Sequence, residues 1–158
     1  MKLSLLLFAF IFMCTIVEAQ PQPTYKIVGV EAFLYYRNLG IFSENIIDNS
    51  EFSLWNVIIG EGSAKGYSKE TLVKIIVEGS GERESIAGNP VLEVTISTAK
   101  SVILRKVINL GLFNSSRKNS YPILLYDTGC SELKITATLI GKGGGSKMVK
   151  VIPFNCGE

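Results

Sequence analysis

The sequence predicts an all-β protein: a single antiparallel β-sandwich, immunoglobulin-like or fibronectin-like, with seven to nine short strands. Val, Ile and Thr make up about a quarter of the residues after position 19, where Ala occurs only five times. Branched side chains lose rotamer freedom in a helix but pack well on a pleated surface. Several segments alternate apolar and polar residues between glycine-containing turns, and no long amphipathic helix is indicated. A jelly roll or a small barrel is the alternative arrangement.

Residues 1–19 have the pattern of a secretory signal peptide. Lys2 supplies the positive start, and the apolar run Leu3–Val17 follows it. A small residue at the end of the run predicts cleavage between Ala19 and Gln20. The run of 15 residues is shorter than the roughly 18 to 20 that span a bilayer. We therefore expect a secreted (extracellular) or periplasmic protein with no stable membrane insertion after cleavage.

Two cysteines follow the signal, and their number and position predict one disulfide. Cys130 and Cys156 form an even pair in a chain expected to leave the cell, where disulfides persist. The loop they would close has 27 residues, for which the chain-entropy model gives about 3.5 kcal/mol. The alternative is two buried free thiols.

The mature chain is expected to form one domain, residues 25–158, after an extended leader at 20–24. The predicted strands are Tyr25–Tyr36 (bent at Gly29), Leu54–Ile59, Thr71–Glu78, Val91–Ser97, Ser101–Leu110, Ile123–Tyr126, Glu132–Ile140 and Lys147–Phe154. The expected loops are Arg37–Ser53 (with a helical turn at Glu44–Ile47), Gly60–Glu70, Asn114–Ser120 and Gly141–Ser146. Short breaks predict two hairpins, one around Ala99-Lys100 and one formed by the last two strands. The cysteines flank the open end of the second hairpin.

Composition excludes several classes of function. The chain has no histidine, so it cannot form a Ser-His-Asp or Cys-His pair or a histidine zinc site. A net charge of +2 is too small for a nucleic-acid footprint. The glycine-rich Gly141–Lys147 lacks the spacing and the helix of a phosphate loop. We therefore expect no cofactor, no metal and no nucleic-acid partner.

Carboxylates are the remaining acid–base candidates, and no spacing among them specifies a catalytic pair. They are Glu31, Glu44, Asp48, Glu51, Glu61, Glu82, Glu84 and Asp127. A carboxylate-based hydrolase would need two of them in one concave pocket. Asp48, Asn49 and Glu51 offer oxygen ligands for calcium, although capping of a turn explains them more simply.

The leading hypothesis is a non-catalytic, secreted or periplasmic binding module for a protein or glycan partner. The aromatic residues considered for its surface are Tyr35, Tyr36, Phe42, Trp55, Tyr67, Tyr121 and Tyr126, of which we select Tyr35, Tyr36 and Tyr67. In a strand, one ring of the adjacent Tyr35 and Tyr36 points inward and the other outward. Asn114 begins a sequon for N-glycosylation. The alternative function is a small inhibitor or immunity-type protein that acts through Arg37–Ser53 or Gly60–Glu70.

Overall fold

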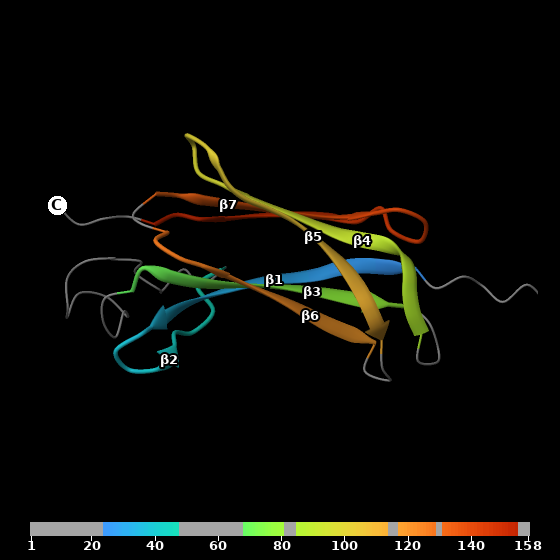
Figure 1. The fold of residues 1–158 in the computed structure, drawn as a ribbon, viewed down its shortest axis with the longest axis horizontal. Coiled ribbons are helices and arrows are strands. Elements are labelled where there is room, and N and C mark those ends of the chain that lie inside the picture. Colours follow the sequence, from blue (N-terminus) through green and yellow to red (C-terminus); the bar gives the residue numbers. More distant parts are fainter. Residues whose placement is uncertain (1–23, 48–67, 81–84, 114–116, 129–130, 155–158) are drawn as a thin grey trace, which may run out of the picture.

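The computed structural model describes residues 24–47, 68–80, 85–113, 117–128 and 131–154. These residues form eight strands and no helix: β1 (Tyr25–Tyr36), β2 (Ile41–Phe42), β3 (Glu70–Gly79), β4 (Ser85–Ser97), β5 (Val102–Phe113), β6 (Lys118–Leu125), β7 (Leu133–Ile140) and β8 (Lys147–Ile152). Two four-stranded antiparallel sheets result, which confirms the predicted all-β class. Sheet 1 has the order β2-β1-β3-β6, and sheet 2 has the order β5-β4-β7-β8. They form two layers, one above the other in Figure 1.

The core lies between the two sheets and follows the alternation in the sequence. In β3, Val73, Ile75 and Val77 are completely buried, while the residues between them face outward. In β7 the predicted inward set is buried in the same way: Leu133, Ile135, Ala137 and Leu139. Each fully buried Val, Leu or Ile contributes about 1.5–3 kcal/mol of transfer free energy. One apolar face from each sheet therefore supplies most of the stability of the fold.

The predicted bend in the first strand is confirmed at Gly29. The pairing of β1 with β3 shifts register between Ile27 and Gly29. A Cβ atom at Gly29 would lie 3.3 Å from Cδ1 of Ile76, closer than most side chains tolerate. Glycine therefore allows β1 to pass close to β3 at the bulge.

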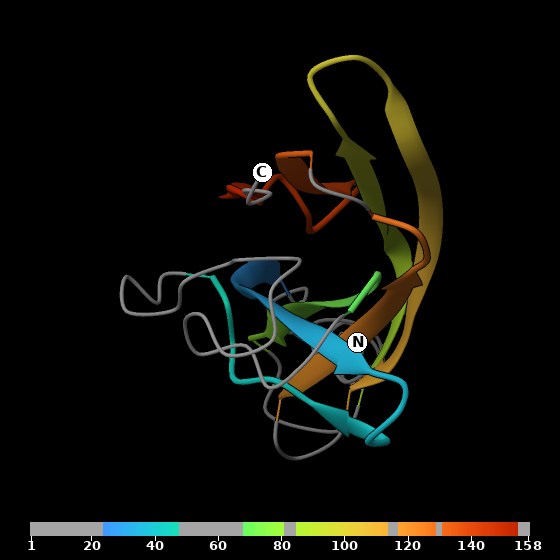
Figure 2. The same ribbon diagram turned by 90° about the vertical axis from the view of Figure 1, so that its left-hand side faces the viewer.

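The hairpin predicted around Ala99-Lys100 is present but longer than expected. Ser97 pairs with Val102, and the pairing continues to Ser85 and Phe113. β4 thus begins six residues before the predicted start at Val91. The early part was missed because an irregularity between Ala87 and Val91 interrupts the alternation. Figures 1 and 2 show the tip of the hairpin projecting beyond the rest of sheet 2.

Two expected loops contain more regular structure than predicted. Lys118–Ser120 was expected in a loop, but these residues begin β6 and pair with β3, because an edge strand can carry polar side chains toward solvent. No helical turn forms at Glu44–Ile47. Instead, Ile46 N donates to Ala32 O at 2.8 Å, and Ala32 N donates to Asn45 Oδ1 at 3.0 Å. These hydrogen bonds hold the segment after β2 in an extended conformation along the edge of β1.

Several predictions lie outside the described residues. They are the signal peptide and its cleavage site at Ala19 and Gln20, the strand Leu54–Ile59 with Trp55, the loop residues Asp48, Asn49 and Tyr67, the sequon residue Asn114, and both cysteines, Cys130 and Cys156. The hairpin that the cysteines flank is described, and its open end pairs Leu133 with Ile152. Within the described residues, no helix is long and apolar enough to cross a membrane.

Candidate functional site

The outer face of sheet 1 carries a row of side chains at the end where β1 finishes and β3 begins. Tyr35 of β1 is paired with Phe42 of β2 on one side and with Glu70 of β3 on the other. Directly opposed residues project from the same face of a sheet. The side chains of Phe42, Tyr35 and Glu70 therefore form one row across β2, β1 and β3.

The two adjacent tyrosines separate as expected for a strand. Tyr35 is half-buried on the outer face, whereas Tyr36 points into the core and is 2% exposed. The inward and outward orientations predicted for this pair are confirmed. Tyr36 is therefore a core residue in this structure and is removed from the candidate binding aromatics.

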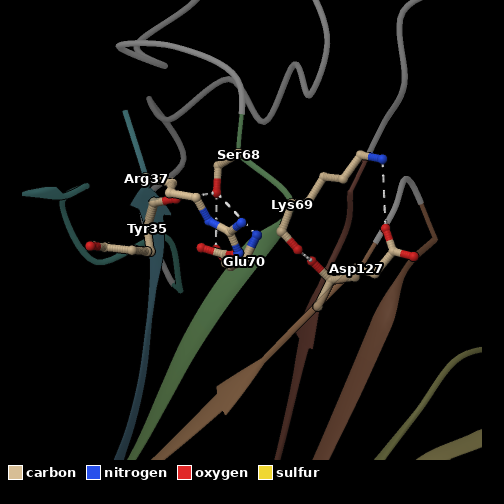
Figure 3. Close-up of polar contacts among 7 residues, drawn as sticks. Tyr35, Arg37, Ser68, Lys69, Glu70 and Asp127 are labelled. Atoms are coloured by element: carbon tan, nitrogen blue, oxygen red, sulfur yellow. Dashed lines mark hydrogen bonds and ion pairs between the residues drawn. The ribbon is translucent and has the colours of Figure 1, made fainter. Parts of the chain in front are cut away.

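A hollow of about 330 Å³ lies beside this row. Its lining comes from the ends of β1 and β6 and the start of β3: Tyr35, Arg37, Asn38, Ser68, Lys69, Glu70, Tyr126 and Asp127. Figure 3 shows two ion pairs around it, Arg37 with Glu70 and Lys69 with Asp127. Its size is at the lower end of the range for ligand sites, which is roughly 300–1,000 Å³.

Glu70 is a buried carboxylate that is held by an exposed arginine. Its side chain is 8% exposed, while that of Arg37 is 73% exposed. The guanidinium of Arg37 donates to Oε1 of Glu70. A buried charge is tolerated when it is paired and hydrogen-bonded, so Arg37 is required for Glu70 to occupy this position. The rest of the guanidinium faces solvent above the hollow.

Hydrogen bonds from two hydroxyl groups brace the three strand ends. Ser68 Oγ donates to Tyr35 O at 2.7 Å, which ties the start of β3 to β1. Thr128 N donates to Lys69 O at 3.0 Å, and Thr128 Oγ1 lies 3.1 Å from Thr71 Oγ1 in a buried hydrogen bond. Ser68, Thr71 and Thr128 are all buried. The hollow is therefore framed by backbone that is fixed on both sides.

The second ion pair is exposed. Lys69 Nζ lies 3.7 Å from Asp127 Oδ1, and both side chains are largely in solvent. An exposed pair of this kind contributes at most about 1 kcal/mol. Asp127 also adopts a left-handed backbone conformation, with φ at 54°, an arrangement that Asp tolerates better than most residues. Both charges can therefore turn from each other to a bound partner at small cost.

Two aromatic side chains, Tyr35 and Tyr126, line the hollow, and further apolar side chains lie next to Tyr35 and in the turn that follows β1. The ring centroids of Tyr35 and Phe42 are 5.0 Å apart. Phe42 is 49% exposed and Tyr126 67% exposed, and Leu39 and Ile41 are also exposed at the turn between β1 and β2. We call Tyr35, Phe42 and Tyr126 the aromatic rim. An exposed apolar group around polar recognition elements is typical of an interaction site.

The carboxylates considered from the sequence are dispersed. Among those described, Glu31 pairs with Lys74, Glu44 lies in the segment after β2, and Asp127 lines the hollow. Asp48, Glu51, Glu61, Glu82 and Glu84 lie outside the described residues. In the described part of the chain, no three His, Cys, Asp or Glu side chains gather as a metal site.

Sequence reasoning named Tyr35 and weighed Phe42, Tyr126 and Asp127, but it missed Arg37, Lys69 and Glu70. No local pattern marks these three residues. They meet only through the antiparallel register of β1 and β3, so the one available signal was the polar triplet Ser68-Lys69-Glu70 immediately before a strong strand. No protein-family model and no curated protein sequence matches this chain. The fold and the hollow therefore define its class as an all-β domain with a framed surface site.

Proposed function

We propose that this chain is a secreted or periplasmic, non-catalytic binding module that recognises a protein partner through the aromatic rim and the hollow. The observation that carries the proposal is the aromatic rim, in which Phe42 and Tyr126 are exposed, beside the exposed Arg37, on backbone that hydrogen bonds hold in place. Tyr, Phe and Arg are enriched at protein interfaces, and Tyr and Arg dominate their hot spots. A partner side chain would enter the hollow while the rim covers the surrounding apolar surface.

The order of strands supports an immunoglobulin-like or fibronectin-like β-sandwich as the finer fold type. In such sandwiches, strands A, B and E are neighbours in one sheet, and C, F and G, with C′ in the variable type, are neighbours in the other. The orders β1-β3-β6 and β5-β4-β7-β8 correspond to A-B-E and C′-C-F-G. In the variable type the partner is bound by the B–C, C′–C″ and F–G loops of one end, whereas the hollow lies at the opposite end, where the strands matching A and E finish and B begins.

Export and the disulfide belong to the same proposal. Residues 1–19 carry the signal pattern. Leu133 and Ile152 are paired at the open end of the β7–β8 hairpin, and the cysteines lie three and four residues beyond them in the sequence. The ends of an antiparallel hairpin are close enough for a bridge, which needs Cα atoms about 5.5 Å apart. A Cys130–Cys156 disulfide would then fasten the last two strands.

Binding is favoured over hydrolysis by the state of the carboxylates in the hollow. Glu70 and Asp127 both line it, so the pocket with two carboxylates that a hydrolase needs is present. Glu70, however, is covered by Arg37 and engaged with its guanidinium. Asp127 faces Lys69. Only Asp127 is exposed, whereas a hydrolase needs two accessible carboxylates, so we propose that the two carboxylates position the two cations for recognition.

A glycan is the second candidate ligand, and the lining of the hollow favours it. Asn38, Lys69 and Asp127 offer hydrogen-bond donors and acceptors, and the exposed ring of Tyr126 adjoins them. The turn at Arg37–Phe42 adjoins the rim, so the alternative of an inhibitor acting through Arg37–Ser53 would use part of the same surface.

The test compares matched variants of the full chain. Phe42→Ser and Tyr126→Ser remove rim side chains, and Ile86→Ser removes an apolar side chain that is 75% exposed on sheet 2. Each protein is used for capture from the native extracellular or periplasmic fraction and on an array of glycans. We expect a protein captured by the wild type and by Ile86→Ser, and lost with both rim variants. Binding of a glycan that only Tyr126→Ser abolishes would favour the second candidate. Capture that both rim variants retain would refute the proposed site.

A further inference from the structure

The outer edge of β5 is closed along one half and open along the other. β5 is the edge strand of sheet 2. Near its end, Tyr121 Oη donates to Leu110 O at 2.6 Å, and Asn119 Nδ2 donates to Leu112 O at 2.7 Å. Side chains of β6 therefore cap the carbonyl groups of this half. Along 102–108, no strand within the described ranges pairs with this side of β5.

The direction of the capped carbonyls identifies the groups available on the open half. In an antiparallel strand, alternate residues turn their N–H and C=O groups to the same side. Since Leu110 and Leu112 turn theirs away from β4, the same direction is expected for Leu104, Lys106 and Ile108. These three residues present a ladder of donors and acceptors that matches the spacing of another strand.

The side chains of the open half are apolar and cationic. Val102, Ile103 and Val107 are exposed, and so are Arg105 and Lys106 between them. This half runs from the projecting tip of the β4–β5 hairpin (Figures 1 and 2) along β4, whose other side pairs with β7. A long, apolar edge strand is a template for pairing with another chain.

The charges on the edge strands limit which chains could pair with the open half of β5. β5 carries two cations and no carboxylate, β8 carries Lys147 and Lys150, and β6 carries Lys118, again without a carboxylate. Like charges opposite each other destabilise a strand pair. A second copy would therefore bring cations against Arg105 and Lys106 from any of these three edges.

The same excess of positive charge extends over the whole of sheet 2. Its described segments, 85–113 and 131–154, contain seven Lys or Arg and two Glu, a net charge of +5. The described segments of sheet 1, 24–47, 68–80 and 117–128, contain six Lys or Arg and five Asp or Glu, a net charge of +1. An approaching acidic segment is thus directed to sheet 2 by the field of the whole layer.

We propose that residues 102–108 of β5 are a strand-addition site for an extended segment of a partner protein that alternates β-branched apolar residues with Asp or Glu. The main chain of the segment pairs with the open ladder, as in other cases of β-augmentation. Adjacent residues of β5 point to opposite faces, so Arg105 lies on the outer face with Val107, and Lys106 lies on the inner face with Leu104 and Ile108. The carboxylates of the segment therefore face Arg105, and its apolar residues cover Leu104 and Ile108. Arg105 Nε lies 3.7 Å from Glu93 Oε1, both in partly exposed side chains, so this pair can accept a further carboxylate.

The probes are three fluorescently labelled peptides, tested with the full mature chain by fluorescence anisotropy. The first is VEVEVEV, the second VKVKVKV, and the third VEVEVEV with alternate backbone nitrogens methylated so that one edge loses its donors. We expect binding of the first peptide alone. Arg105→Glu/Lys106→Glu should weaken that binding by about tenfold or more, because it reverses both charges at the site. Lys147→Glu/Lys150→Glu changes the net charge equally on β8 and should retain it.

Three outcomes would overturn the proposal. Equal binding of the methylated peptide would show attraction of charge without strand pairing. Equal losses in the β5 and β8 variants would place the effect in net charge and not at this edge. Concentration-dependent dimerisation in analytical ultracentrifugation that Arg105→Glu/Lys106→Glu abolishes would identify a second copy as the occupant.

Discussion

The rim end of sheet 1 and the open half of β5 in sheet 2 handle charge in opposite ways. At the hollow, cations and carboxylates come from within the chain in pairs, Arg37 with Glu70 and Lys69 with Asp127. On β5, two adjacent cations stand among exposed aliphatic residues with no carboxylate on their own strand. The charges of the first surface balance in pairs. On the second, Glu93 of β4 faces Arg105, and the two adjacent cations leave an excess of positive charge that a partner could balance. The difference indicates a shape-dependent site in one sheet and a charge-dependent edge in the other.

The difference also has a structural origin. The rim end is braced by Ser68 and Thr128, whose hydroxyl and backbone groups join β1, β3 and the end of β6. Among the described strands, β4 alone pairs with the open half of β5, and the capping hydrogen bonds of Asn119 and Tyr121 reach its other half. Fixed backbone suits recognition by a preformed hollow, whereas an open edge suits pairing with a chain that arrives unstructured.

The largest expected effect is that of removing the predicted disulfide at the open end of the β7–β8 hairpin in sheet 2. Cys130→Ser/Cys156→Ser should lower the free energy of unfolding by about 3.5 kcal/mol, since the unfolded chain gains the entropy of a 27-residue loop. Urea denaturation of both proteins measures the loss. Intact mass after alkylation without reductant supplies the control. Two alkylated thiols in the native wild type would refute the disulfide.

The next effect separates the two arginines that pair with carboxylates. Arg37→Ala should cost about 3 kcal/mol, because it leaves the buried carboxylate of Glu70 without its cation. Arg105→Ala should cost less than about 1 kcal/mol, because its pair with Glu93 is partly exposed. Denaturant midpoints of both variants provide the comparison.

The double variant Arg37→Ala/Glu70→Gln is the control for this interpretation. Replacing the carboxylate by a neutral amide removes the uncompensated charge, so most of the lost stability should return. A double variant as unstable as Arg37→Ala alone would mean that the arginine acts through packing, and the contrast between the two surfaces would lose its electrostatic basis.

The sequence predicted the strands where burial imposes a period of two, and it missed the features that depend on pairing. Apolar and polar residues alternate in β3 and β7 because one face of each strand is buried, and this pattern can be recognised from the sequence alone. Glu70 belongs to the same strand as Val73, yet its burial results from Arg37, which lies 33 residues earlier and meets it through register. The composition of β5 does not indicate which of its halves is closed. Only the position of β6 makes one closed and the other open.

A smaller effect tests the bracing of the rim. Ser68→Ala should cost about 1–2 kcal/mol, since it removes the hydroxyl that donates to Tyr35 O and accepts from Glu70 N. Hydrogen exchange at the amides of Tyr35 and Glu70 should quicken, while that of β7 stays unchanged. An equal increase in exchange rate across both sheets would contradict a local role for Ser68, because it would indicate a loss of global stability alone.

A further small effect, about 1 kcal/mol, is expected at the capped half of β5, and it depends on pH. Burial raises the pKa of Tyr121, although a hydrogen bond with Asn119 opposes the shift. The unfolded phenol titrates near its ordinary pKa of about 10. Above that pH the unfolded state releases the proton first, so stability is fully present below pH 10 and falls as pH rises through the higher pKa of the folded state.

Tyr121→Phe removes both the hydrogen bond to Leu110 O and this fall in stability. Thermal unfolding of the two proteins between pH 8 and 11 should therefore converge at the alkaline end. Parallel curves would show that the phenol does not cap β5, and the boundary between its closed and open halves would have to be set by Asn119 alone.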